Sequence, residues 1–140
     1  WWVVTAAGIG GVGGSEGCTG SEPGDSGWGA AMVAWAVAKH VRSTALVLAS
    51  GRATLGIGAG QTSRVDSMSI ALDKSNGELN GAAVGSDAFF PFTDALDLAL
   101  PKGITVVIQP GGSNRDAEVI KLCDEHDVAM IFTKTRHFLH

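Results

Sequence analysis

The sequence has 140 residues, of which 45% are hydrophobic and 17% are charged, and its formal net charge is −4. This length fits one domain with a buried core, and the charge gives no basic surface for a nucleic-acid partner. The longest uninterrupted apolar stretch, residues 30–38, is far shorter than the ~20 residues of a membrane span. No charged segment precedes an apolar run at the start, so we expect neither a signal peptide nor a membrane partner.

The two cysteines, Cys18 and Cys123, are far apart in the sequence. They form neither a metal-binding pair nor a recognisable disulfide framework. A reduced, cytoplasmic setting is therefore the simplest interpretation. Cys123 fits the pattern of a small apolar side chain on a buried helix face.

The first 29 residues differ from the rest of the chain. Residues 1–5 are compatible with a strand, but residues 8–29 contain ten glycines. Such a stretch gains little from burial and loses much backbone entropy on ordering, which predicts an irregular lead-in over 1–29. Its glycine run is only a weak match to a dinucleotide-binding loop, because the strand–loop–helix context is missing.

From residue 30 onward, strand and helix patterns alternate. Lys39 and His40 suit the end of the first helix, and Pro101 should stop another. Ser113 with Asp116 resembles a capping box that opens a helix. Strands alternating with helices predict an α/β fold in which helices cover both faces of the sheet. In chain order, the predicted elements are a helix at 30–41, strands at 45–49 and 54–58, a helix at 62–75, a strand at 82–85, a helix at 93–100, a strand at 104–108, a helix at 113–127 and a strand at 128–132.

Residues 86–92, Ser-Asp-Ala-Phe-Phe-Pro-Phe, are the most distinctive segment. Proline restricts its own backbone and that of the preceding residue, so the segment should be extended or turned. Phe89, Phe90 and Pro91 would form an apolar ledge between the carboxylates Asp87 and Asp94, suited to a planar, nitrogen-rich ring. The alternative is an ordinary core strand that enters a helix.

Two glycine-containing loops follow predicted strands. In the first, residues 56–64, the glycines would let a ligand or another backbone come close, and Gln61 and Arg64 could bind polar groups. The alternative there is a tight turn with a surface arginine. The second loop, residues 109–113, lies at the carboxyl end of a strand, where α/β proteins tend to bind ligands, but it could equally be a plain connection.

The C-terminal segment 135–140 contains Arg136, two histidines and a phenylalanine. Because terminal segments are usually poorly ordered, this composition suggests a tail that is docked on a polar surface. The histidines are scattered, and the His-x-Glu and Pro-Cys-x-x-Cys motifs of zinc deaminases are missing, so no zinc site is predicted.

Together, KHVRST (39–44), GIGAGQTSR (56–64), SDAFFPF with Asp94, IQPGGS (108–113) and the terminal RHFLH resemble one family. It is the bifunctional purine-biosynthesis family of aminoimidazole carboxamide ribonucleotide (AICAR) formyltransferase/IMP cyclohydrolase. The resemblance runs from about residue 35 to residue 140 and concerns the C-terminal part of the transformylase domain. It implies a layered αβα subdomain of cytidine-deaminase-like type with a mixed sheet over 30–140.

The resemblance implies a function and a set of site residues. The family reaction moves a formyl group from 10-formyltetrahydrofolate, the co-substrate, to AICAR. The implied folate and AICAR contacts are Gln61, Arg64, Phe89, Phe90, Pro91, Asp94 and Arg136. A structural monovalent cation such as potassium is implied near Ser43, Asp87 and His140, and a homo-oligomer or a complementing subunit is implied as the partner.

Departures from the family pattern leave an alternative open. Thr44 stands at the position of a family asparagine that helps to orient the catalytic machinery. Thr93 and Leu139 stand where bacterial members usually carry arginine. The family's catalytic Lys-His pair belongs to a subdomain missing here; Lys39 and His40 are not that pair. The chain is therefore expected to be part of a formyltransferase or, alternatively, a degenerate, non-catalytic ligand-binding or oligomerisation module.

Overall fold

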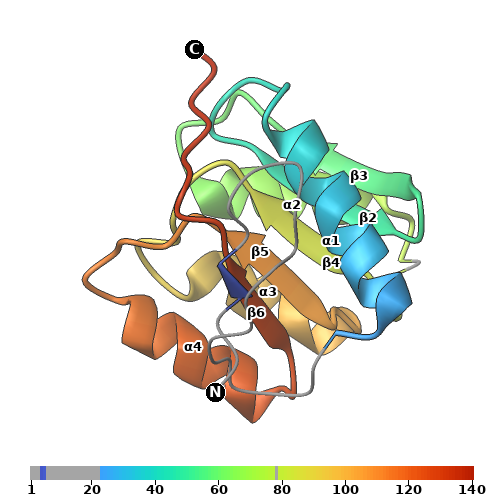
Figure 1. Ribbon diagram of the computed structural model, residues 1–140. Coiled ribbons are helices and arrows are strands. Elements are labelled where there is room, and N and C mark those ends of the chain that lie inside the picture. The colour runs from blue at the N-terminus through green and yellow to red at the C-terminus, as the bar shows by residue number, and fades with distance from the viewer. Residues whose placement is uncertain (1–3, 6–22, 78) are drawn as a thin grey trace.

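A computed structural model describes residues 4–5, 23–77 and 79–140 of the protein. Within these residues the chain forms a six-stranded sheet in the order β1-β6-β5-β4-β2-β3 (Figure 1). The β4, β5, β6 and β1 strands are parallel neighbours, whereas β2 is antiparallel to both β3 and β4. The predicted mixed α/β sheet is confirmed. The strands are β1 (Val4–Thr5), β2 (Leu46–Ser50), β3 (Ala53–Gly58), β4 (Ala83–Ser86), β5 (Val106–Gln109) and β6 (Ala129–Phe132).

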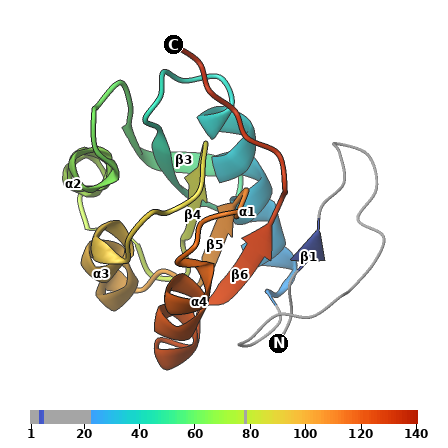
Figure 2. The same cartoon turned by 90° about the vertical axis from the view of Figure 1, so that its left-hand side faces the viewer.

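Helices cover both faces of the sheet, as predicted. Figure 2 shows α1 on one face and α2, α3 and α4 on the other. Side-chain alternation along β2 explains this: Leu46 and Leu48 join the core beneath α2 and α3, while Val47 packs with α1. The helices are α1 (Asp25–Ala38), α2 (Arg64–Lys74), α3 (Asp94–Ala99) and α4 (Asp116–Glu125), with a 3₁₀ turn η1 (Leu100–Lys102) after α3.

Two predicted helix starts are wrong. The α1 helix begins at Asp25 rather than at residue 30, because Gly27 is buried close to Val106, and its missing side chain lets the helix approach β5. The α4 helix begins at Asp116 rather than at Ser113. The reciprocal bonds of the predicted capping box are nevertheless present. The Asp116 carboxylate accepts from the N–H groups of Gly112 (2.7 Å) and Ser113 (3.2 Å), and Ser113 Oγ accepts from the Arg115 N–H at 3.1 Å. Residues 1–3 and 6–22 of the predicted lead-in lie outside the described residues, and the division at 29/30 stays a prediction.

Close backbone contacts explain two glycines of the segment 56–64. A Cβ atom on Gly56 would lie 2.0 Å from the Ala71 carbonyl oxygen, and one on Gly58 would lie 1.7 Å from that of Ser67. Both neighbours belong to α2, so the glycines admit another backbone, one of the two alternatives that the sequence left open.

Candidate functional site

Segments from distant parts of the sequence meet at one edge of the sheet. The parallel strands β4, β5 and β6 all end there, so the segments 87–92, 110–115 and 133–139 follow one another along this edge. Since β2 is antiparallel to β4, its first residues also lie there, as does the end of β3. The topology therefore brings together the distinctive motifs of the sequence.

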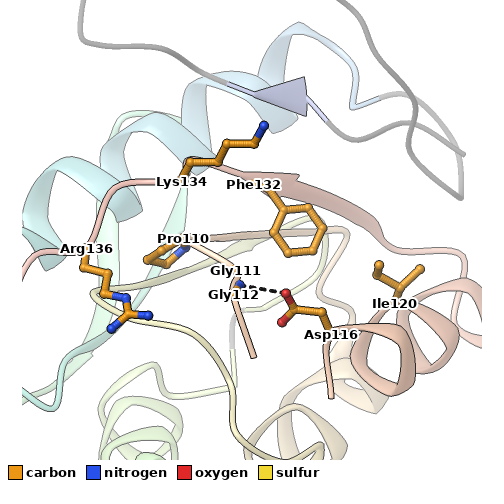
Figure 3. Close-up of a pocket in the computed structure, with 8 residues that line it drawn as sticks. All are labelled: Pro110, Gly111, Gly112, Asp116, Ile120, Phe132, Lys134 and Arg136. Atoms are coloured by element: carbon orange, nitrogen blue, oxygen red, sulfur yellow. Dashed lines mark hydrogen bonds between the residues drawn. The ribbon is translucent and has the colours of Figure 1, made fainter. Parts of the chain in front are cut away.

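Two adjoining hollows lie at this edge, and both include Gly112. The larger has a volume of about 490 Å³ and is lined by Pro110, Gly111, Gly112, Asp116, Ile120, Phe132, Lys134 and Arg136 (Figure 3). The smaller has a volume of about 360 Å³ and is lined by Phe89, Pro91, Phe92, Gly112, Ser113, Asn114 and Arg115. Both hollows therefore lie beyond the carboxyl end of β5, beside the 109–113 loop, and ligand binding there stays a prediction.

Backbone conformation shapes the floor of the larger hollow. Gly111 and Gly112 have φ angles of +75° and +99°, which side-chain-bearing residues rarely adopt. A Cβ atom on Gly111 would lie 2.4 Å from the Phe132 ring. Figure 3 shows this ring between Gly111 and Ile120, with the bond from the Gly112 N–H to Asp116 beside it. The glycines therefore let the 110–113 loop pass against the aromatic wall.

Cations outnumber carboxylates around the larger hollow. Lys134 and Arg136 take part in no ion pair among the described residues, whereas Asp116 already accepts two backbone bonds. The Arg136 guanidinium carbon lies 5.0 Å from the ring centre of Phe89, and that of Arg115 lies 4.9 Å from the ring centre of Phe92. Arg115 is paired with Glu118 at 3.4 Å, so only the Phe89 face lies beside a cation with no ion pair among the described residues. That combination suits an anionic ligand with a planar group.

The predicted aromatic ledge is divided by the structure. Phe89 and Pro91 line the smaller hollow, and Phe92 is half exposed beside them. Phe90 has no exposed surface and packs in the core beneath α2 and α3, so its ring does not line either hollow. The Phe90 N–H donates to the buried Gln109 side chain at 3.3 Å, which fixes the turn.

Arg64 lines neither hollow and instead contacts the backbone of the segment that carries Phe89. Its Nη1 atom is 2.9 Å from Asp87 Oδ1, and its Nε–H donates to the Phe89 carbonyl oxygen at 2.8 Å. Ser43 Oγ donates to the other carboxylate oxygen of Asp87. The Asp87 side chain is fully buried, as expected for a carboxylate whose two oxygens both have partners.

Three other predicted site residues make local contacts. The Gln61 side chain donates to the Ala59 carbonyl oxygen at 3.2 Å, and the Gln61 carbonyl accepts from the Thr44 N–H at 3.1 Å. The Thr44 carbonyl in turn accepts from Ser67 Oγ. Asp94 is exposed, and its carboxylate accepts from the Ala95 N–H at the start of α3. None of these three residues lines either hollow.

The residues suggested for a monovalent cation lie only partly together, and that site stays a prediction. Ser43 and Asp87 are neighbours, but Arg64 supplies the positive charge that Asp87 needs. His140 is exposed, and its ring stacks on Phe138 with the ring centres 5.8 Å apart. No group of three or more His, Cys, Asp or Glu side chains in the described part of the chain could hold a metal ion.

The C-terminal tail is docked, as its composition predicted. Backbone N–H groups of Lys134 and His137 donate to the carbonyl oxygens of Pro110 and Asp87, at 3.0 and 2.8 Å. The centre of the His137 ring lies 4.9 Å from that of Trp35. Burial lowers the pKa of His137, and the positive charges of Lys39 and His40 lower it further, whereas Asp87 acts in the opposite direction. This docking places Arg136 over Phe89.

Several lining residues were absent from the sequence-based set, among them Phe132, Lys134 and Ile120. The rule that identified the 109–113 loop also applies to the strand before Lys134, so that signal was available. Ile120 could not be found this way, because the orientation in which α4 packs on the sheet decides which of its side chains face the hollow. Lys134 has a φ of +56°, an uncommon conformation that often marks functional positions.

The chain belongs to the α/β class, and proteins of this class commonly bind ligands beyond the carboxyl ends of their parallel strands. No helix in the described segments is both long and apolar enough to cross a membrane. Comparisons with known proteins narrow this class.

A family model described as the AICARFT/IMPCHase bienzyme matches residues 14–74. The bifunctional purine biosynthesis protein PurH of Aquifex aeolicus is 54% identical over 112 residues, covering 78% of this chain and 22% of that protein. PurH of Myxococcus xanthus is 57% identical over 107 residues, covering 76% and 21%, and PurH of Bacillus subtilis is 48% identical over 119 residues, covering 85% and 23%. The chain is similar to part of these PurH proteins, and it spans between a fifth and a quarter of their length.

Proposed function

We propose that this chain forms one part of an AICAR formyltransferase site, in which a formyl group passes from 10-formyltetrahydrofolate to AICAR during purine biosynthesis. The observation that carries the proposal is the pair of adjoining hollows, where the Phe89 ring lies beneath Arg136, which has no ion pair among the described residues. An aromatic face can hold a pterin or imidazole ring, and the cations can hold a phosphate or carboxylate. Both substrates combine a planar, nitrogen-rich ring with negative charge.

Formyl transfer also needs a group that removes a proton from the weakly nucleophilic amine and donors that stabilise the tetrahedral oxyanion. The resemblance assigns the catalytic Lys-His pair to a subdomain outside this chain, and Thr44 replaces the family asparagine. The role we assign to this chain is therefore binding and positioning, through Phe89, Pro91 and Arg136. A second copy or a complementing subunit in the cytoplasm would complete the site. Potassium near Ser43, Asp87 and His140 stays a prediction of the resemblance, and Asp87 also binds Arg64 and Ser43 there.

Calorimetric titration with AICAR and, separately, with a folate analogue tests the binding role. We expect the chain to bind at least one of them and Arg136→Ala to weaken that binding by roughly tenfold, the usual effect of losing a charge-assisted hydrogen bond. Arg52→Ala in the exposed β2–β3 turn should leave the affinity unchanged. No heat with either ligand at millimolar concentration would contradict the proposal.

A formyl-transfer assay tests the division of labour. The purified chain alone should show no turnover, because it lacks the proton-transfer pair. Substantial turnover by this chain would mean that the catalytic group lies within its own 140 residues.

A further inference from the structure

Arg64 and Asp87 form an ion pair that lies outside both hollows. The pair contacts the two segments that carry Phe89 and Arg136. The Asp87 side chain is fully buried, and that of Arg64 is 12% exposed. Neither residue lines the larger or the smaller hollow. Their part in the site must therefore be indirect.

The guanidinium of Arg64 holds the segment that ends in Phe89. Besides its contact with Asp87, Nη1 donates to Ser86 Oγ at 3.1 Å, and Nε donates to the Phe89 carbonyl oxygen at 2.8 Å. Arg64 is the first residue of α2, so the start of this helix fixes the turn after β4. A planar guanidinium with several donors can make these bonds simultaneously, whereas an ammonium cannot reach all of them in one geometry.

Asp87 extends the same network to the tail. Its carbonyl oxygen accepts from the His137 N–H at 2.8 Å, and its carboxylate accepts from Ser43 Oγ. Ser43 is paired with Leu139, since its N–H donates to the Leu139 carbonyl oxygen at 2.8 Å and its Oγ accepts from the Leu139 N–H at 3.3 Å. Arg136 precedes His137, so this pairing fixes the backbone on which Arg136 is carried.

We infer that Arg64 and Asp87 are positioning residues that couple the 86–89 segment to the C-terminal tail. Through this coupling they set the contact between Phe89, which lines the smaller hollow, and Arg136, which lines the larger. The coupling is independent of the ligand's identity; its effect on affinity rests on the proposed function.

Arg64→Lys tests the coupling, because it keeps a positive charge beside Asp87 and removes the planar donor set. We expect hydrogen exchange at the His137 and Leu139 amides to rise by roughly tenfold, although Arg64 touches neither residue. Exchange within β5 should stay unchanged. Arg52→Lys, an exposed substitution of the same type, is the matched control and should change none of these rates.

Ser43→Ala is a second, milder variant that removes the hydroxyl shared by Asp87 and Leu139. It should raise hydrogen exchange at the Leu139 amide and in the 86–89 segment together. This variant also keeps the inference testable if Arg64→Lys does not fold. Unchanged tail exchange in a folded Arg64→Lys protein, or in Ser43→Ala, would overturn the coupling.

Titration with AICAR and with a folate analogue separates this inference from the proposed function. If the wild-type chain binds, Arg64→Lys should weaken binding by roughly tenfold, with the pocket-lining side chains unaltered. If the wild-type chain binds neither compound but the exchange rates respond as expected, the proposed function fails and the coupling stands. If the wild-type chain binds and the exchange rates do not respond, the coupling fails and the function stands.

Discussion

At the scale of single residues, Gly111 is the position where backbone and side-chain packing most constrain the site. Gly111→Ala combines a φ of +75° with a Cβ atom 2.4 Å from the Phe132 ring. We expect a loss of about 2–4 kcal/mol in the free energy of unfolding, measured by urea denaturation. The displaced Phe132 ring should also narrow the larger hollow.

Gly77→Ala is the matched control for this substitution. Gly77 has a φ of +80°, but a Cβ atom there would meet nothing within 4 Å. It should therefore show the conformational cost alone, about 1 kcal/mol. Equal losses for the two variants would mean that Phe132 moves freely and that the ring does not form a fixed wall.

Cys123 gives a second prediction at this scale. Burial, with a smaller effect of Asp124, raises the pKa of the thiol from 9.0 to about 12. The thiol is therefore protonated at pH 8, and only the thiolate reacts readily. In a Cys18→Ser background, we expect Cys123 to react with a disulfide reagent only as the protein unfolds in urea. Rapid labelling of the native protein would contradict its burial.

At the scale of the elements, the start of α2 connects local capping with the site, because Arg64 is its first residue. Ser63 Oγ accepts from the Asp66 N–H at 3.1 Å. Ser63→Ala should lower the free energy of unfolding by about 1 kcal/mol, the usual cost of losing an N-cap. Thermal unfolding measures this, with Ser69→Ala at an exposed mid-helix position as the control. A loss as large in Ser69→Ala would show that the cap is not the cause.

The elements themselves were largely predictable from local pattern. Strands such as β5 are rich in β-branched apolar residues. Pro101 ended α3 as expected, with the 3₁₀ turn following. The early start of α1 was missed because Gly27 and Gly29 have low helix propensity, and the reason for a glycine there is a tertiary contact with Val106. Propensity describes the isolated segment, whereas this contact exists only in the folded sheet.

At the scale of the whole molecule, the site was predictable as a region but not as a set of contacts. The motifs around Phe89 and Arg136 were found in the sequence, and the parallel topology brings them to one edge. Arg64 was expected to contact substrate, yet in the structure its bonds are to Ser86, Asp87 and Phe89. Sequence spacing cannot tell a donor that faces a pocket from one that faces the loop behind it.

The tail gives the prediction that belongs to the whole chain. Deleting residues 134–140 removes the bonds to Pro110, Asp87 and Ser43, but the three apolar core clusters contain no residue beyond Phe132. We therefore expect the shortened chain to fold, with a free energy of unfolding lower by about 2–4 kcal/mol, since each net backbone bond contributes about 1 kcal/mol. Urea denaturation followed by circular dichroism measures this loss.

Trp35 reports on the same deletion, because its ring packs against His137. In a background with phenylalanine at Trp1, Trp2 and Trp28, we expect its fluorescence to shift to longer wavelength when residues 134–140 are removed, as the indole gains access to water. Deleting residues 138–140 alone is the matched control: it removes the Leu139–Ser43 pair and leaves His137 on Trp35, so the spectrum should stay close to that of the full chain. Complete unfolding of the 134–140 deletion would show that the tail is part of the core, and an unchanged spectrum would show that it is not docked on α1.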